Sequence, residues 1–139
     1  LMVNNNIFTG RLPTELSRII PMQQAFAHSY SFTGPIPSEL ATWIDLQLFA
    51  VDDNKLTGTI PTEIGIWNSL TLLSMRNNSL TGTVPTELGW CSSLRTLAIS
   101  QNFLYGKLPT ELGQLSALEW LRVANNGFVG TLAYVYNTS

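Results

Sequence analysis

Residues Asn54 to Gly65 read N-K-L-T-G-T-I-P-T-E-I-G, and this stretch decides the fold because it returns at a fixed interval. It recurs from Asn78 to Gly89 as N-S-L-T-G-T-V-P-T-E-L-G and from Asn102 to Gly113 as N-F-L-Y-G-K-L-P-T-E-L-G. Its glycine stands at positions 10, 34, 58, 82, 106 and 130, so every interval is 24 residues without an insertion. Such self-similarity predicts a solenoid, in which each repeat stacks on its neighbours.

The residues that precede the stretch predict a short strand. The run Leu46-x-x-Phe49-x-Val51-x-x-Asn54-x-Leu56 fits the pattern L-x-x-L-x-L-x-x-N-x-L, and the later repeats contain it as well. Alternating apolar residues place one face of a strand inward, and strands joined by long connections of constant hand run parallel. The asparagine amide can satisfy backbone groups where the chain turns, and copies stacked at ~4.8 Å would form a ladder.

The end of the stretch predicts a turn followed by a short helix. Each glycine suits a backbone conformation, or a close approach, that a Cβ would forbid. The prolines at 13, 37, 61, 85 and 109 suit the first position of a helix, and a glutamate two residues later falls in its first turn. A cation-binding stripe is the alternative interpretation of the glutamates, but one helix-start role accounts for all five copies.

Together these motifs resemble the plant-type leucine-rich repeats of receptor-kinase ectodomains and polygalacturonase-inhibiting proteins. The motif T-G-T-I-P-T-E also resembles the repeats of leucine-rich-repeat proteins from algae such as diatoms. The resemblance covers the whole chain and implies an α/β solenoid: a right-handed leucine-rich-repeat superhelix with a parallel β-sheet on the concave face and short 3-10 helices on the convex side. We expect residues 1–139 to form a single domain of about six 24-residue repeats, truncated at both ends.

The same resemblance implies a module for protein–protein or protein–ligand recognition, part of a larger receptor-like or secreted protein. Its partner would be a protein or peptide, and its location extracellular or at the cell surface. The parent protein can be membrane-anchored, although no apolar run in the chain approaches the roughly 18 residues of a membrane span. Two sequons make Asn77 and Asn137 candidates for glycosylation.

Composition argues against several other classes of function. Only 12% of residues are charged, and the seven basic residues do not cluster as in a nucleic-acid-binding protein. The single cysteine, Cys91, shares an inward column with Ile19, Trp43, Trp67 and Leu115 and is expected in the core. No metal-ligand spacing or phosphate-binding loop occurs, so we expect no metal, no cofactor and no enzyme activity. A set of Ser29, His28 and Asp52 resembles a catalytic triad only as much as any few polar residues do.

We expect ligand-binding residues where the outward positions of the strands differ between repeats. The candidates are Phe26, His28, Leu48, Asp52, Leu72, Arg76, Trp120 and Arg122. Column neighbours should lie one strand spacing apart, so the sequence predicts a charged row from His28 to Arg76 and an adjoining apolar patch. Aromatic and arginine side chains beside a polar rim are typical of binding hot spots. The alternative is a solvated ladder of charges and apolar residues scattered by chance.

Two repeats depart from the pattern. In the second, Ala25 and Ala27 occupy leucine sites and Tyr30 replaces the asparagine, which predicts a local dent. Degeneration by drift is the preferred reason for it, and a ligand-shaped cavity is the alternative. In the last repeat, Ala133 replaces the proline and Val135 the glutamate. That copy is therefore either near the end of the solenoid or degenerate.

Threonine rows support a second hypothesis, an ice-binding surface like that of some plant-type relatives. The rows comprise Thr9, Thr33, Thr57 and Thr81, then Thr59, Thr83 and Thr131, then Thr14, Thr62, Thr86 and Thr110. They are interrupted by Arg11, Pro35, Tyr105, Lys107 and Val129.

Overall fold

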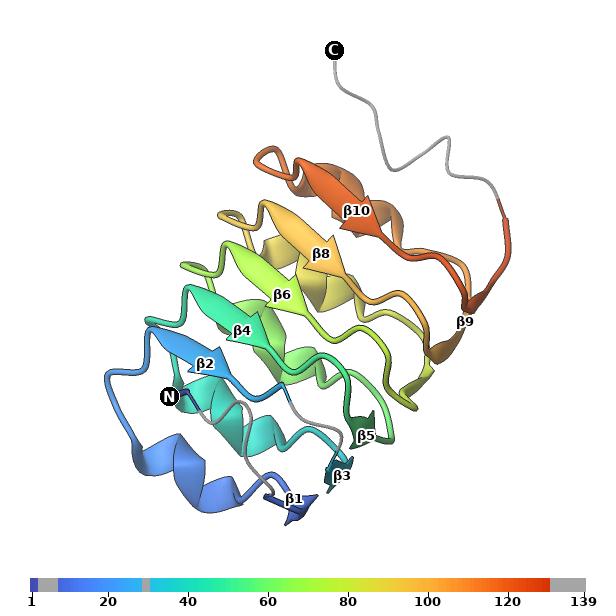
Figure 1. Cartoon of the computed structure of the whole chain (residues 1–139). Helices are drawn as coiled ribbons and strands as arrows, with labels where there is room; N and C mark the ends of the chain where they lie inside the picture. The colour runs from blue at the N-terminus through green and yellow to red at the C-terminus, as the bar shows by residue number, and fades with distance from the viewer. Residues whose placement is uncertain (3–7, 29–30, 131–139) are drawn as a thin grey trace.

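The computed structural model describes residues 1–2, 8–28 and 31–130, which wind into a coil of repeated turns (Figure 1). A full turn contributes one strand to a main sheet, one short lateral strand and one 3-10 helix. The main-sheet strands are β2 (Gln24–Phe26), β4 (Leu48–Ala50), β6 (Leu72–Ser74), β8 (Thr96–Ala98) and β10 (Trp120–Arg122). The helices are η1 (Thr14–Arg18), η2 (Ser38–Thr42), η3 (Thr62–Ile66), η4 (Thr86–Trp90) and η5 (Thr110–Gln114).

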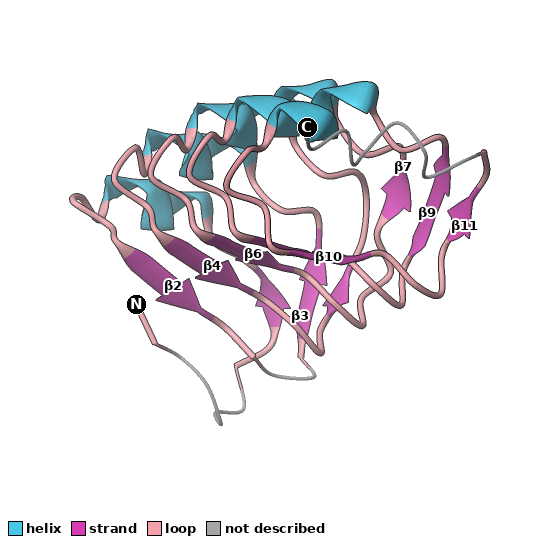
Figure 2. Ribbon diagram, turned by 90° about the horizontal axis from the view of Figure 1, so that it is seen from above, coloured by secondary structure: helices cyan, strands magenta, loops and turns pink. Residues whose placement is uncertain are grey.

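The main sheet is parallel and in strict register. Its described strands follow the order β10-β8-β6-β4-β2, and each residue lies opposite its equivalent 24 positions away, as Leu48 does to Leu72. Figure 2 shows the helices along one side of the coil and this sheet on the other. The fold is therefore an α/β solenoid with a parallel sheet on the concave face and short 3-10 helices on the convex side, as the sequence predicts.

The core lies between these two layers and follows the inward columns. Phe49 and Val51 are buried, as predicted. Trp43, Trp67 and Cys91 are buried as well, but Ile19 of the same column is exposed, so that part of the prediction is wrong. Trp43 and Cys91 contact the helix of the preceding repeat, through the carbonyls of Leu16 and Ile64. Ile19 ends η1, and no described helix precedes η1 to cover it.

The asparagine column joins successive turns through the backbone. The Asn78 amide donates to the carbonyls of Val51, Met75 and Arg76 at 3.0, 3.3 and 3.1 Å, and its Oδ1 accepts the Leu56 N–H at 3.0 Å. Equivalent bonds are made by Asn54, Asn102 and Asn126. The predicted ladder exists, but it passes from amide to backbone rather than from amide to amide.

A second set of parallel strands, which the sequence analysis did not predict, forms a lateral wall between the main sheet and the helices. These strands are β1 (Gly10–Arg11), β3 (Phe32–Gly34), β5 (Lys55–Leu56), β7 (Thr81–Gly82), β9 (Phe103–Gly106) and β11 (Gly127–Phe128). A bond from the Ser79 N–H to the Leu56 carbonyl, 2.8 Å, links the two halves of this wall. The Leu-Thr-Gly segments after each asparagine are therefore strands and not only turns.

Gly82 shows both features expected of the repeated glycine, an unusual backbone conformation and a close approach by a neighbour. Its φ is 84°, and a Cβ there would lie 2.8 Å from the Thr59 methyl of the preceding repeat. The proline position is one residue off, because Pro61 caps η3 rather than beginning it. The Pro61 carbonyl accepts the Ile64 N–H, while Glu63 lies in the first turn as predicted.

The second repeat is more regular than predicted. Ala25 and Ala27 are buried, and β2 pairs with β4 along its length. A cavity of about 340 Å³ opens nearby beside Met22 and Trp43, but neither alanine lines it. Tyr30, Ala133 and Val135 lie outside the described residues.

Candidate functional site

The outer surface of the main sheet carries a shallow groove of about 470 Å³, here called the sheet groove. Its lining comes from the five strands of the main sheet and from residues two positions beyond three of them. Seven of the eight predicted ligand-binding residues line it: Phe26, His28, Asp52, Leu72, Arg76, Trp120 and Arg122. Leu48 is half-buried and in register with Leu72 but is not part of the lining.

The groove is hollow because its floor is made of small side chains. Ala50, Ser74 and Ala98 lie opposite one another on adjacent strands and belong to the lining. The same column continues to Phe26 at one end and Arg122 at the other. Four strand spacings separate these ends, which is roughly 19 Å. The groove therefore runs across the strands, along the axis of the coil.

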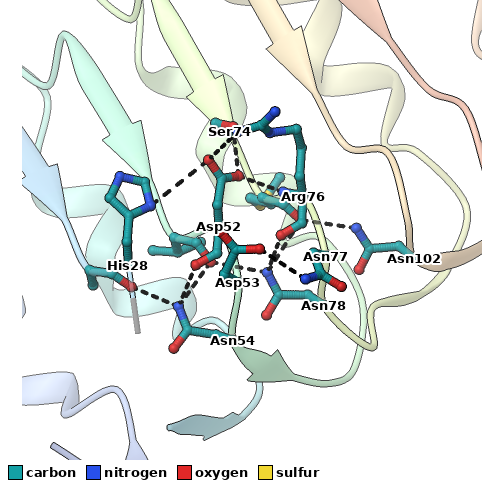
Figure 3. Close-up of polar contacts among 12 residues, drawn as sticks. His28, Asp52, Asp53, Asn54, Ser74, Arg76, Asn77, Asn78 and Asn102 are labelled. Carbon is teal, nitrogen blue, oxygen red and sulfur yellow. Dashed lines mark hydrogen bonds and ion pairs between the residues drawn. The ribbon is translucent and has the colours of Figure 1, made fainter. Parts of the chain in front are cut away.

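One side of the groove is a polar cluster centred on Asp52 (Figure 3). Asp52 Oδ1 accepts the Ser74 hydroxyl at 2.6 Å and the Arg76 N–H at 2.7 Å, while Oδ2 lies 3.3 Å from Arg76 Nη2 and 3.8 Å from His28 Nδ1. Asp52 is only 5% exposed, so the predicted alternative of a solvated ladder is wrong for this residue. Bonds from fixed backbone and hydroxyl groups hold the carboxylate in place, and the carboxylate in turn orients Arg76.

The far end of the groove presents an aromatic ring and a cation. Trp120 is 57% exposed, and the Arg122 guanidinium lies 5.7 Å from the centroid of its ring, within the range of a cation–π contact. The neighbouring Arg95 and Glu119 form an ion pair with each other. Among the described residues Arg122 has no ion-pair partner, so its charge is available to a ligand.

Other candidate residues have different environments. Asn77 is exposed at the end of the sheet with a φ of 52°, and its amide donates to Asp53 Oδ1 at 2.8 Å. Asn137 and Ser29 lie outside the described residues. Burial raises the pKa of the Cys91 thiol to about 11, so its reactive thiolate form is scarce at neutral pH. Within the described ranges, no group of three or more His, Cys, Asp or Glu side chains is placed to hold a metal ion.

Sequence reasoning did not single out two kinds of residue. Ser74 stood in an outward column, but nothing local indicated that its hydroxyl would bind Asp52 from 22 residues away. Phe103 and Tyr105 are exposed on the lateral wall, and the signal for them was their difference from Ser79 and Thr81 in the preceding repeat.

The described threonines of the three rows are all exposed. Arg11, Pro35, Tyr105, Lys107 and Val129 are exposed too and interrupt the first two rows, while Ser38 stands in place of a threonine in the third. Thr131 lies outside the described residues.

Comparisons with known proteins agree with this architecture. The family model described as Leucine Rich Repeat matches residues 69–91 and 93–115. No curated protein matches the chain. None of the helices in the described part of the chain has the length and apolar character needed to cross a membrane.

Several solved structures are similar to the chain over most of its length. The ectodomain of the membrane receptor kinase GASSHO1/SCHENGEN3 from Arabidopsis thaliana, in complex with CASPARIAN STRIP INTEGRITY FACTOR 2, is 35% identical with a TM-score of 0.84, and the match covers 86% of this chain and 14% of that one. The Arabidopsis receptor kinase HAESA, in complex with the peptide hormone IDA and the co-receptor SERK1, is 30% identical with a TM-score of 0.87, covering 91% and 21%.

A plant ice-binding protein is also similar, at 25% identity and a TM-score of 0.79, with 86% of this chain and 39% of that one covered. The chain thus spans less than a quarter of the two receptor chains. Repeat period, asparagine ladder, lateral strands and the matched repeats all agree. The chain therefore belongs to the leucine-rich-repeat proteins, and its repeats are of the plant type.

Proposed function

We propose that residues 1–139 act as one recognition module that binds a protein or peptide through the sheet groove. The observation that carries this proposal is the convergence of seven predicted residues on one groove. They stand at outward positions where the repeats differ, so the repeated pattern of the coil does not require these particular side chains. A rigid repeated backbone with variable side chains on one face is the arrangement of a binding surface.

Binding in this groove would depend on side chains. The N–H and C=O groups of the inner strands are already paired within the main sheet, so a ligand cannot add itself there as a further strand. Phe26 and Trp120 supply apolar area, and Arg76 is held in place by Asp52. Because Asp52 already orients Arg76, little entropy of that side chain is lost on docking.

The solved relatives support a receptor-like setting. The two receptor structures named above are complexes with a named factor and with a peptide hormone, respectively. By analogy, the chain would be part of a longer extracellular or cell-surface protein that binds its partner rather than transforms it. The activity and the partner of that longer protein are proposed here by analogy.

Ice binding is the less favoured function. It rests on the exposed threonines and on the similarity to a plant ice-binding protein. An ice surface is regular, whereas Tyr105 and Lys107 break the rows of the lateral wall. We expect no thermal hysteresis from the chain, and a clear hysteresis would favour ice binding over the sheet groove.

Selection from a library of linear peptides, followed by calorimetry, tests the proposal. Combined Phe26→Ala and Trp120→Ala substitution should weaken a selected peptide at least tenfold, a loss of about 1.4 kcal/mol or more. Trp90→Ala is the matched control, because Trp90 is 60% exposed, close to the 57% of Trp120, but belongs to η4. Equal losses in both variants, or no loss in the double variant, would contradict the proposal.

A further inference from the structure

The lateral wall carries a second surface, here called the lateral face, formed by the outward residues of β1, β3, β5, β7, β9 and β11 and the loops that follow them. On β9, Phe103 and Tyr105 are 67% and 57% exposed. They are two residues apart and so project from the same face of the strand, about 7 Å from each other. Opposite Tyr105 stands Gly127, which has no side chain to cover the ring, and the exposed Val129 follows. The ring faces are therefore open to a flat ligand.

The lateral face is also cationic. Arg11, Lys55 and Lys107 are exposed there, none has an ion-pair partner among the described residues, and no acidic residue occurs on the described lateral strands. The five repeated glutamates lie in the helices. Glu39 and Glu63 line a hollow together with Arg11, so the charge of Arg11 is offset there and Lys55 and Lys107 are the cations left to a ligand. Lys55 and Lys107 are separated by two repeats, roughly 10 Å along the axis of the coil, and Lys107 stands four residues farther along its turn. A ligand for this face should carry negative charges spread along an extended shape.

Hydroxyl groups fill the space between these cations. Thr57, Thr59, Thr81 and Thr83 are exposed in the central repeats. Each hydroxyl can donate one hydrogen bond and accept others. Open aromatic rings, hydroxyls and separated cations together match a sugar polymer, whose rings have an apolar C–H face, a polar edge and, in uronic acids, a carboxylate.

We propose that the lateral face binds an anionic polysaccharide, a linear polyuronate, independently of the sheet groove. Sugar rings would stack on Phe103 and Tyr105, and carboxylates would pair with Lys107 and, farther along the coil, with Lys55. A nucleic acid fits less well, because its strand carries a phosphate every ~3.4 Å, far denser than these cations. A protein partner fits less well too, because the apolar area is confined to one end of the face.

The repeats supply matched substitutions for the test. Phe103→Ser and Tyr105→Thr introduce the residues found one repeat earlier, and Lys107→Thr does the same for its column. The fold should tolerate all three, which circular dichroism and the melting temperature would verify. The probe is an alginate oligosaccharide, with a neutral glucan oligosaccharide of equal length as its control, titrated by calorimetry at low and high NaCl.

We expect the alginate oligosaccharide to bind more tightly than the neutral one, and to bind more weakly at high NaCl. The aromatic double variant and Lys107→Thr should each lower the affinity at least fivefold. The combined Phe26→Ala and Trp120→Ala variant should bind alginate unchanged, which separates this proposal from the function of the sheet groove. Absence of alginate binding, unchanged binding by the lateral variants, or tighter binding of polyglutamate or single-stranded DNA would overturn it.

Discussion

Replacing Asn78 with alanine should remove one link between two turns of the coil. The substitution deletes four hydrogen bonds, three donated to carbonyls and one accepted from the buried Leu56 N–H. The three carbonyls each keep another donor: Asn54 on Val51, Asn102 on Met75 and the Asp53 N–H on Arg76. Only the Leu56 N–H is left without an acceptor. A buried orphan donor costs about 1–3 kcal/mol, so with the lost bonds we expect the free energy of unfolding to fall by about 2–4 kcal/mol.

Urea unfolding followed by tryptophan fluorescence measures this loss, and amide hydrogen exchange locates it. The Leu56 N–H should lose its protection from exchange. The Leu80 N–H donates to Asn102 Oδ1 at 3.0 Å and should keep its protection. Asn126→Ala is the control, because Asn126 is only half-buried and water can replace its bonds, so about 1 kcal/mol should be lost. A cost below about 1 kcal/mol for Asn78→Ala, with Leu56 still protected, would refute the reasoning.

Two further predictions concern single positions. Gln101 has a φ of 58°, so Gln101→Gly should raise the free energy of unfolding by about 0.5–1 kcal/mol in urea titration, whereas Ser100→Gly, at an ordinary φ, should lower it. The raised pKa of Cys91 implies no maleimide labelling of the folded chain at pH 8 but rapid labelling in urea. Because its folded pKa of about 11 exceeds the ordinary 9.0, the stability linked to this thiol is complete below pH 9 and is lost as pH rises towards 11. The Cys91→Ala protein should not lose this part of its stability between pH 9 and pH 11. Identical profiles of stability against pH for the two proteins would contradict the raised pKa of Cys91.

Much of the fold was predictable because every repeat has the same pattern of residues. The inward columns, the asparagine ladder and the helix start are set by residues within a few positions of one another, and repetition averages out local exceptions. Ile19 shows the limit of that reasoning, since its burial depends on a neighbouring repeat. The lateral strands were missed because two or three residues give too short a pattern to recognise, and only stacking between repeats pairs them.

The candidate site was predictable as a set of columns but not as a shape. Seven of the residues predicted from outward positions at a 24-residue period line the sheet groove, because register carries each one to its neighbour. The depth of the groove was not predicted, since it depends on how far Leu72 and Trp120 stand above the small side chains of the floor. The burial of Asp52 was not predicted either, because its hydrogen-bond partners belong to the next repeat.

The sequence by itself determined the period, the parallel stacking and the division between residues that build the coil and residues that do not. These properties follow from local backbone preferences and apolar alternation, which every repeat repeats. Only the tertiary structure decided that Asp52 is a buried carboxylate orienting Arg76, and that Phe103 and Tyr105 are exposed on the lateral wall. Such properties depend on side-chain contacts and exposure between turns of the coil, and the one-dimensional pattern does not specify them.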